Sequence, residues 1–300
     1  MSEFVKIVEV GPRDGLQNEK QALTVEQRLN FINDLISAGL KSIEVGSCVS
    51  AKWVPQMAQS DELFKLLPQT TDVQFSLLTP NIKGFETAQA VGCKEVAVFT
   101  AASESFTRKN INCSIDESFE KFSDVLSAAK AHNIRVRGYV SCIVDCPYEG
   151  AIAPEQVVKV VKRLYDMGCY EVSLGETIGT ATPDRVQKVW QACLAELDSK
   201  VLAGHFHNTY GMAIANIYQS LQQGIRVFDS SLAGLGGCPY AKGASGKVST
   251  EDLFYLLSHM GFETGIDLEK LMQASQNISN VLNRKSLSNY ANAYWQTKYA

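Results

Sequence analysis

The most constraining feature of the sequence is a unit that recurs along the chain. A helical pattern of apolar residues runs into a glycine, and a short β-branched or aromatic run follows within a few positions, at 37–46, 90–99, 166–175 and 222–231. Glycine just past the end of a helix is typical of the left-handed C-cap. Each unit therefore predicts a helix that leads directly into a strand.

Eight strands are predicted in all, because similar runs occur at 5–10, 73–78, 134–140 and 200–207. Two of the helical patterns place apolar residues at i, i+3, i+4 and i+7, which predicts one apolar stripe against a sheet: Val157, Val160, Val161 and Leu164, and Ile214, Ile217, Tyr218 and Leu221. No G-x-G-x-x-G follows the first strand. The alternation predicts an α/β fold, a closed parallel (β/α)₈ TIM barrel rather than an open sheet.

The chain length agrees with one such barrel. The 300 residues accommodate a barrel of about 250 residues with an appendage, so residues 1–300 are predicted to form a single domain. No linker precedes 266–300, which is predicted to be an additional C-terminal helix and a tail. That helix either covers the bottom of the barrel or forms a homodimer contact.

Charge and hydropathy exclude two classes of partner. A net charge of -4 and a pI near 5.7 leave no basic stripe for nucleic acid, and no apolar run reaches the roughly 18 residues of a membrane span. The start, "MSEFVKIVEVGPRDG", shows no targeting segment, and the eight cysteines form no C-x-x-C pair. We therefore expect a cytoplasmic protein with reduced thiols and a small-molecule partner.

Polar residues gather where the predicted strands end, which is the face that carries active sites in these barrels. They are Arg13 and Asp14 after the first strand, Glu44 on the second, Arg137 and Tyr139 on the fifth, Ser173, Glu176 and Thr177 on the sixth, His205 and His207 on the seventh, and Cys238 and Lys247 after the eighth.

The two histidines of "HFHNTYG" suggest a metal site. Side chains at i and i+2 of a strand point the same way, so His205 and His207 face the barrel axis together, with Asp14 as the nearest plausible carboxylate. Such nitrogen and oxygen ligands suit Mg²⁺, Mn²⁺ or Zn²⁺. The alternative is a pair of structural histidines at a strand end.

Long strings make the family resemblance specific: "VEVGPRDGLQNEK", "KWVPQM", "LTPNIKGFE", "FTRKNINCSI", "RGYVSC", "CPYEG", "TIG" and "GLGGCPYAKGASG". Over residues 4 to 285 the chain resembles the 3-hydroxy-3-methylglutaryl-CoA lyases of the DRE-TIM metallolyase superfamily. The resemblance implies a carbon–carbon lyase of leucine degradation and ketone-body metabolism. It would cleave its acyl-CoA substrate to acetoacetate and acetyl-CoA with Mg²⁺ or Mn²⁺.

The resemblance also implies roles for individual residues. Asp14, His205 and His207 would hold the metal, with Asp14 or a histidine taking the hydroxyl proton. Arg13 would hold the thioester oxygen, oriented by Glu44, and Cys238 would protonate the enolate. The remaining assignments are substrate binding by Gln17, Tyr139, Ser173, Glu176 and Thr177 and coenzyme A binding by Lys20, Lys109 and Asn110.

Each role has a structural alternative. Arg13 and Glu44 could form an ion pair that only braces the barrel mouth, Cys238 could be a buried apolar residue, and the exposed lysines could simply be solvated.

The sequence departs from the family pattern at three positions. Asn208 and Glu176 each stand where the family usually has aspartate, and Lys247 stands where it usually has an asparagine near the metal. Asn208 can still cap a helix, Glu176 displaces its carboxylate, and Lys247 would repel a cation unless it turns away or loses its proton, so metal affinity is expected to fall. The alternatives to an active lyase are a paralogue that binds another acyl-CoA and a condensing enzyme related to isopropylmalate synthase.

Overall fold

The computed structural model describes residues 3–68, 72–237 and 246–298. Eight parallel strands, each paired with its neighbours in chain order and the last with the first, close into a barrel, which confirms the predicted fold. The strands are β1 (Lys6–Glu9), β2 (Ser42–Ser47), β3 (Gln74–Leu78), β4 (Glu95–Ala101), β5 (Arg135–Ser141), β8 (Glu171–Glu176), β9 (Leu202–Phe206) and β10 (Val227–Ser230).

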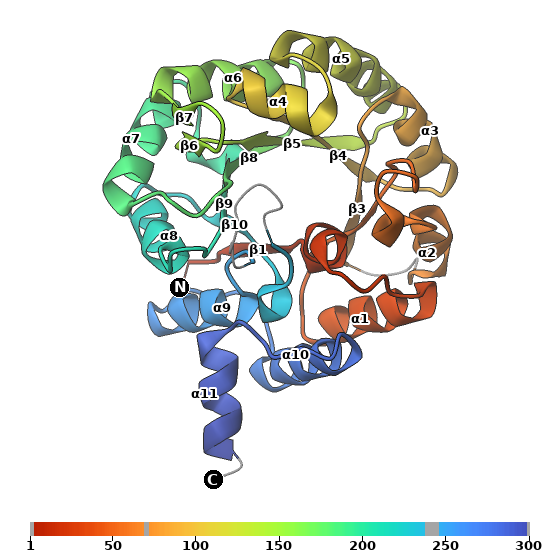
Figure 1. Cartoon of the computed structure of the whole chain (residues 1–300), viewed down its shortest axis with the longest axis vertical. Coiled ribbons are helices and arrows are strands. Elements are labelled where there is room, and N and C mark those ends of the chain that lie inside the picture. The colour runs from red at the N-terminus through yellow and green to blue at the C-terminus, as the bar shows by residue number, and fades with distance from the viewer. Residues whose placement is uncertain (1–2, 69–71, 238–245, 299–300) are drawn as a thin grey trace.

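Helices surround the barrel, as Figure 1 shows looking onto its open end. The ring contains α1 (Val25–Ser37), α2 (Ser60–Leu66), α3 (Ile82–Ala90), α5 (Ile115–Ala131), α6 (Pro154–Asp166), α7 (Pro183–Leu194), α8 (Ala213–Gln222) and α9 (Thr250–His259). A further helix, α4 (Glu104–Ile111), and a small hairpin, β6 (Asp145–Cys146) and β7 (Gly150–Ala151), belong to the loops after β4 and β5. Short helical turns occupy other loops: η1 (Gly11–Gly15), η2 (Leu16–Asn18), η3 (Pro55–Met57), η4 (Ser199–Val201) and η5 (Leu232–Gly234).

The glycines of the recurring unit have the predicted role. Gly39, Gly92, Gly168 and Gly224 all have positive φ, between 82° and 112°, just after α1, α3, α6 and α8. An L-residue with a side chain pays a steric penalty in this region, whereas glycine does not. These glycines end each helix and turn the chain into the next strand.

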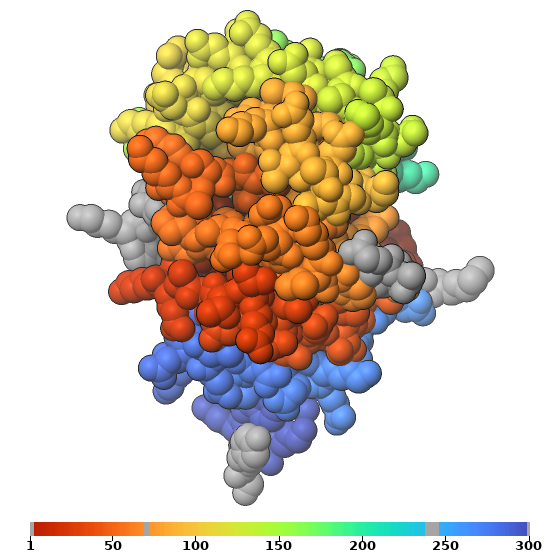
Figure 2. Space-filling view, turned by 90° about the vertical axis from the view of Figure 1, so that its right-hand side faces the viewer, coloured from red at the N-terminus to blue at the C-terminus, as the bar shows by residue number. Residues whose placement is uncertain are grey.

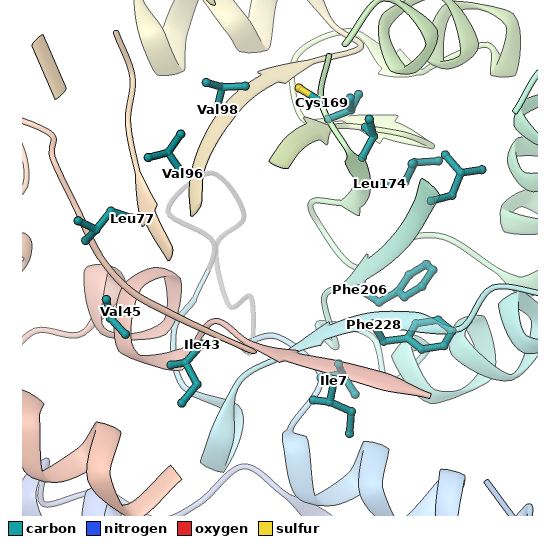
Figure 3. Packing of buried hydrophobic residues seen from close by; sticks show 14 of the residues in the cluster. Ile7, Ile43, Val45, Leu77, Val96, Val98, Cys169, Leu174, Phe206 and Phe228 are labelled. Carbon is teal, nitrogen blue, oxygen red and sulfur yellow. The ribbon is translucent and has the colours of Figure 1, made fainter. Parts of the chain in front are cut away.

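The apolar core lies between the strands and the helices. Figure 3 shows outward-facing side chains such as Ile43, Leu77, Val98, Phe206 and Phe228 on their strands, and all of these are buried. The inward-facing positions are therefore free to carry polar residues, which converge on the barrel axis.

The predicted apolar stripes are only partly correct. All four residues of the α6 stripe are buried, but in α8 the predicted Tyr218 is 49% exposed. The buried face of α8 instead includes Asn216 and Ser220, whose polar groups bond to the Ala181 carbonyl and the Trp190 indole N–H. Because these small polar residues are satisfied inside, the helix is rotated and Tyr218 points outward.

The C-terminal segment differs from the predicted helix and tail, because it holds two helices, α10 (Leu268–Val281) and α11 (Asn289–Lys298). The first packs along α1, where the Asn277 amide donates to Asp34, rather than covering the barrel bottom. Figure 2 shows this blue segment directly beneath the red one of α1. The Asp252 carboxylate accepts the N–H of Tyr290 and so fixes the start of α11. In the described ranges, no helix is long and apolar enough to span a membrane.

Candidate active site

A pocket of about 830 Å³ opens at the carboxyl ends of the strands. Ten of the residues singled out in the sequence line it: Arg13, Asp14, Gln17, Asn110, Tyr139, Ser173, Thr177, His205, His207 and Lys247. Because strand ends far apart in sequence meet at this face, the barrel brings together residues from six strands and their loops.

A tight turn presents Arg13 and Asp14 to the pocket. The Val10 carbonyl accepts N–H groups from Arg13, Asp14 and Gly15, so the chain coils sharply at η1 directly after β1. A Cβ on Gly11 would lie 2.5 Å from a Glu9 carboxylate oxygen, which explains the glycine. The "GPRDG" string therefore encodes a fixed turn whose two charged side chains share one pocket.

Glu44 forms an ion pair with Arg13 on the side of Arg13 that faces away from the pocket. Its carboxylate, fully buried on β2, lies 2.6 Å from Arg13 Nε and is not part of the pocket lining. Burial alone would lower the pKa of Arg13, but Glu44 and then Asp14 raise it above its ordinary value. The guanidinium stays charged, and its carbon lies 5.7 Å from the centre of the Tyr139 ring. Arg13 thus faces the pocket and Glu44 fixes its orientation.

Asp14 and the two histidines have the donor types that a divalent cation needs. His205 Nε2 lies 3.6 Å from Asp14 Oδ2, the two imidazole centres are 5.4 Å apart, and the buried His207 Nδ1 has no hydrogen-bond partner among the described residues. Burial, followed by Lys247 and His205, lowers the pKa of His207 well below its ordinary value. A neutral imidazole is the form that binds metal.

Lys247 stands beside the same carboxylate. Its ammonium nitrogen lies 3.1 Å from Asp14 Oδ2 and 3.2 Å from the Asp14 carbonyl oxygen, and its side chain is 2% exposed. Burial would raise the pKa of Asp14, but Lys247 and then Arg13 hold it well below its usual range. Within the described ranges, no three His, Cys, Asp or Glu side chains are gathered closely enough to hold a metal ion. The donor types fit a cation, but in this arrangement Lys247 is the positive partner of Asp14.

A buried network orients His205 from the far side. Asp229 on β10 is 2% exposed, and its Oδ2 accepts from Ser173 at 2.7 Å and lies 3.0 Å from His205 Nδ1. Arg137 Nη2 lies 2.8 Å from Asp229 Oδ1 and, despite burial, holds the pKa of Asp229 well below its usual range. The ionised Asp229 can only accept, so His205 carries a proton on Nδ1, and its Nε2 is the ring nitrogen that faces Asp14.

Asp229 was not among the predicted site residues. Its signal in the sequence was a carboxylate within the predicted strand of "RVFDSS", at a position that alternation turns toward the axis. Arg137 Nη1 also donates to the Tyr139 hydroxyl at 2.8 Å, so the same network fixes a second pocket residue.

The predicted coenzyme A and loop residues are only partly at the pocket. Asn110 lines it, whereas Lys20 is exposed and the Lys109 ammonium lies 3.9 Å from the Tyr148 ring centre, neither on the pocket lining. Cys238 lies outside the described residues, and Gly237 just before it lines the pocket.

Comparison with known proteins identifies the family. Residues 4–278 match the family model described as HMGL-like. The hydroxymethylglutaryl-CoA lyase of Pseudomonas mevalonii is 58% identical over 277 residues, 92% of each chain. The chain belongs to the HMGL-like family.

Solved structures of this family have the same architecture. The crystal structure of hydroxymethylglutaryl-CoA lyase from Pseudomonas aeruginosa has a TM-score of 0.96 and 54% identity, covering 99% of each chain. An HMG-CoA lyase from Acinetobacter baumannii, in complex with coenzyme A and 3-methylmalate, has a TM-score of 0.92 and 32% identity, covering 97% of this chain and 95% of that one.

Two of the three departures from the HMGL-like pattern leave their local structure intact. The Asn208 side chain accepts the N–H of Ala213, the first residue of α8, at 3.3 Å, although the N-cap position of that helix is Met212 rather than Asn208. Glu176 is not part of the pocket lining and points away from it. Its Oε1 accepts the Thr180 N–H at 3.1 Å, and its Oε2 has no hydrogen-bond partner among the described residues. Burial raises the pKa of Glu176 to about 7. The third departure, Lys247, is the one that lies in the pocket.

Proposed function

We propose that this protein cleaves 3-hydroxy-3-methylglutaryl-CoA to acetoacetate and acetyl-CoA. The observation that carries the proposal is that Arg13, Asp14 and His205 face one pocket at the mouth of the barrel, within the distances given above. Membership of the HMGL-like family and a relative that is 58% identical and named as a hydroxymethylglutaryl-CoA lyase support the same activity.

The family depends on a divalent cation, and Mg²⁺ or Mn²⁺ is our proposal for this member. Asp14, His205 and His207 are the residues that would hold it, and it would supply Lewis-acid stabilisation of negative charge on the tertiary oxygen of the substrate. Coenzyme A is the expected carrier of that substrate, as in the named relatives.

Asp14 is the group that we assign to take the hydroxyl proton. The imidazoles of His205 and His207 would use their lone pairs as ligands, which leaves a carboxylate oxygen of Asp14 as the available base. Lys247 and Arg13 make Asp14 a weak base by lowering its pKa. Proton transfer therefore requires that the hydroxyl be acidified in the same site.

Arg13 supplies the positive charge for the other half of the reaction. As the carbon–carbon bond breaks, the electron pair moves into the thioester fragment, and negative charge develops on its oxygen. The guanidinium is buried, charged and held by Glu44, so it can stabilise that oxygen without first reorienting. Cys238, which lies outside the described residues, would then give a proton to the enolate carbon.

Polar groups around the pocket are suited to hold the rest of the substrate. Gln17, Tyr139, Ser173 and Thr177 line it, and Thr177 is fixed because its hydroxyl accepts the Cys142 N–H at 2.8 Å. We assign these four to substrate binding, and Asn110, Lys20 and Lys109 to coenzyme A.

Glu176 is assigned a different role from the one predicted. Its carboxylate accepts the N–H of Thr180, so we propose that it positions the loop after β8 rather than touching substrate.

The test is acetoacetate release from 3-hydroxy-3-methylglutaryl-CoA by the purified protein, with Mg²⁺, with Mn²⁺ and after chelation. We expect release that chelation abolishes and that added metal restores. The matched control is Asp14→Asn, which removes the proposed base and ligand but keeps the shape of the side chain. Absence of release from the folded parent with either metal would contradict the proposal.

One alternative is weaker. A paralogue that only binds another acyl-CoA is not favoured, because the relatives at 58% and 54% identity are named as lyases.

Three features stay predictions from the sequence: the one-domain organisation of residues 1–300, the cytoplasmic location and a homodimer.

A further inference from the structure

Two fully buried carboxylates lie behind the pocket and outside its lining. Glu9 is the last residue of β1 and Glu251 belongs to the first turn of α9, and each is 0% exposed. Neither forms an ion pair with any described residue, although burying an unpaired carboxylate is costly. Burial raises the pKa of each to about 7. The hydrogen bonds that these two carboxylates accept must therefore offset the cost of burying them.

Glu9 joins two loops through one oxygen. Its Oε1 accepts the N–H of Gly11 at 2.8 Å and the N–H of Leu232 at 3.0 Å, while its Oε2 accepts the Thr250 hydroxyl at 2.6 Å. Gly11 begins the η1 turn and Leu232 begins the η5 turn. A single carboxylate thus connects the loops after the first and the last strand of the barrel.

Glu251 binds Ala233, the residue after Leu232 in the η5 turn. Both of its oxygens accept the N–H of Ala233, at 3.1 and 3.0 Å, and the hydroxyl of Ser275 on α10 donates to it. Ala233 has φ of 56°, a left-handed conformation that a residue with a Cβ adopts only when the surroundings compensate. The carboxylate stabilises this strained turn and ties it to α10.

The two turns carry or precede pocket residues and pack tightly on each other. The η1 turn carries Arg13 and Asp14, and the η5 turn leads through Gly236 to the pocket residue Gly237. A Cβ on Gly15 would come within 2.7 Å of the Ser231 hydroxyl, and one on Gly236 would come within 2.9 Å of Lys247 Nζ. The separation of the turns therefore decides where Asp14 lies relative to Lys247.

We propose that Glu9 and Glu251 are positioning residues: Glu9 clamps the η1 turn to the η5 turn, and Glu251 holds the η5 turn on α10, so that Arg13 and Asp14 stay fixed relative to Lys247. The clamp needs hydrogen-bond acceptors of the right reach, and it needs no negative charge. It deepens the proposed lyase function, on which its kinetic test rests. It also gives the C-terminal helix α10 a role in the site through Ser275.

The discriminating pair of variants is Glu9→Gln and Glu9→Asp. Glutamine keeps the reach, because its amide oxygen can accept from Gly11 and Leu232 while its NH₂ donates to Thr250, whose hydroxyl turns to Ser230, 2.8 Å away. Aspartate keeps the charge but is one methylene shorter and cannot reach both loops. We expect Glu9→Gln to keep kcat within about threefold and Glu9→Asp to lower it by about 100-fold, because a displacement near 1 Å has that effect on a positioned group.

Amide hydrogen exchange tests the clamp without substrate. Glu9→Asp should accelerate exchange at 11–15 and 232–237, and Glu9→Gln should not. Glu251→Ala should accelerate exchange at 232–237 alone. The matched control is Glu95→Gln, a buried carboxylate at the opposite end of the barrel that is paired with Arg135, and it should leave both segments unchanged.

The outcomes separate the two claims. Faster exchange only in the variants that lose reach supports the clamp even when the parent shows no lyase activity, which would count against the proposed function alone. Loss of kcat in Glu9→Gln equal to that in Glu9→Asp would overturn the clamp, because it would mean that the charge itself acts. Unchanged exchange in Glu9→Asp would overturn it as well.

Discussion

The ammonium nitrogen of Lys247 lies 3.1 Å from Oδ2 of Asp14, with its side chain almost completely buried. From the sequence, a lysine at this position could avoid repelling a nearby cation either by losing its proton or by turning its side chain away. The structure excludes the second of these, because the Lys247 side chain lines the pocket. The carboxylate that we assign to the metal already has a positive partner.

Replacing this lysine should strengthen metal binding. We expect Lys247→Asn to raise the affinity for Mn²⁺ by about tenfold or more, since removing a unit charge a few ångströms from a divalent ion relieves a repulsion of at least about 1.4 kcal/mol. Free Mn²⁺, followed by electron paramagnetic resonance during a titration, measures it. Lys247→Met is the control: an equal gain there assigns the effect to charge, and a gain only with asparagine assigns it to the amide oxygen. Unchanged affinity in both would contradict the prediction.

Asp229 should act on the metal through His205. In Asp229→Asn the carboxamide cannot impose the Nδ1–H tautomer of His205, and Arg137 loses its charged partner. We expect Mn²⁺ affinity to fall by about 10- to 100-fold, which is typical when a partner behind a ligand histidine is lost. Asp145→Asn, which breaks the Arg185 pair away from the pocket, should leave it unchanged. Equal affinities in parent and Asp229→Asn would refute the tautomer argument.

Arg13 should not tolerate exchange for lysine. A lysine in Arg13→Lys has no planar fork with which to meet Glu44 and Asp14 together, so the charge would no longer be fixed toward the thioester oxygen. We expect kcat to fall by about 100-fold or more, as when an oxyanion donor is removed. Steady-state kinetics of acetoacetate release measure kcat and KM separately. Arg163→Lys, which alters a half-exposed surface pair, is the control, and near-parental kcat in Arg13→Lys would argue for a purely bracing pair.

Glu176 should make stability depend on pH. Burial raises its pKa in the folded state to about 7, above the value near 4.5 of an unperturbed glutamate, so the folded state binds the proton more tightly. Its contribution to stability is therefore largest below pH 4.5, declines as the pH rises to 7, and is constant above. Glu176→Gln resembles the protonated form.

The measurement for Glu176 is urea unfolding at pH 5 and pH 8. Between these values the free energy of unfolding of Glu176→Gln should rise relative to the parent by about 2 kcal/mol. A difference between variant and parent that is the same at both pH values would show that Glu176 is already ionised throughout.

Much of the fold was accessible from the sequence because its signals are local. The glycines after α1, α3, α6 and α8 and the alternating strands depend on neighbouring residues only, and all eight strands were predicted. The exposed Tyr218 and the second C-terminal helix were missed, because both depend on what packs beside them. Asn216 and Ser220 find partners only in the folded barrel, and α11 is fixed by Asp252 on another helix.

The features of the site likewise divide into those that the sequence predicted and those that only the tertiary structure shows. Chain order and strand alternation determined that Arg13, Asp14, His205 and His207 would share one face, since parallel strands place their ends together. The partners of these residues were decided only by the tertiary structure: Asp229 behind His205, Glu9 between two turns, and Lys247 beside Asp14. Those contacts join residues up to 233 positions apart, where direction and burial depend on closure of the whole barrel and no local pattern records them.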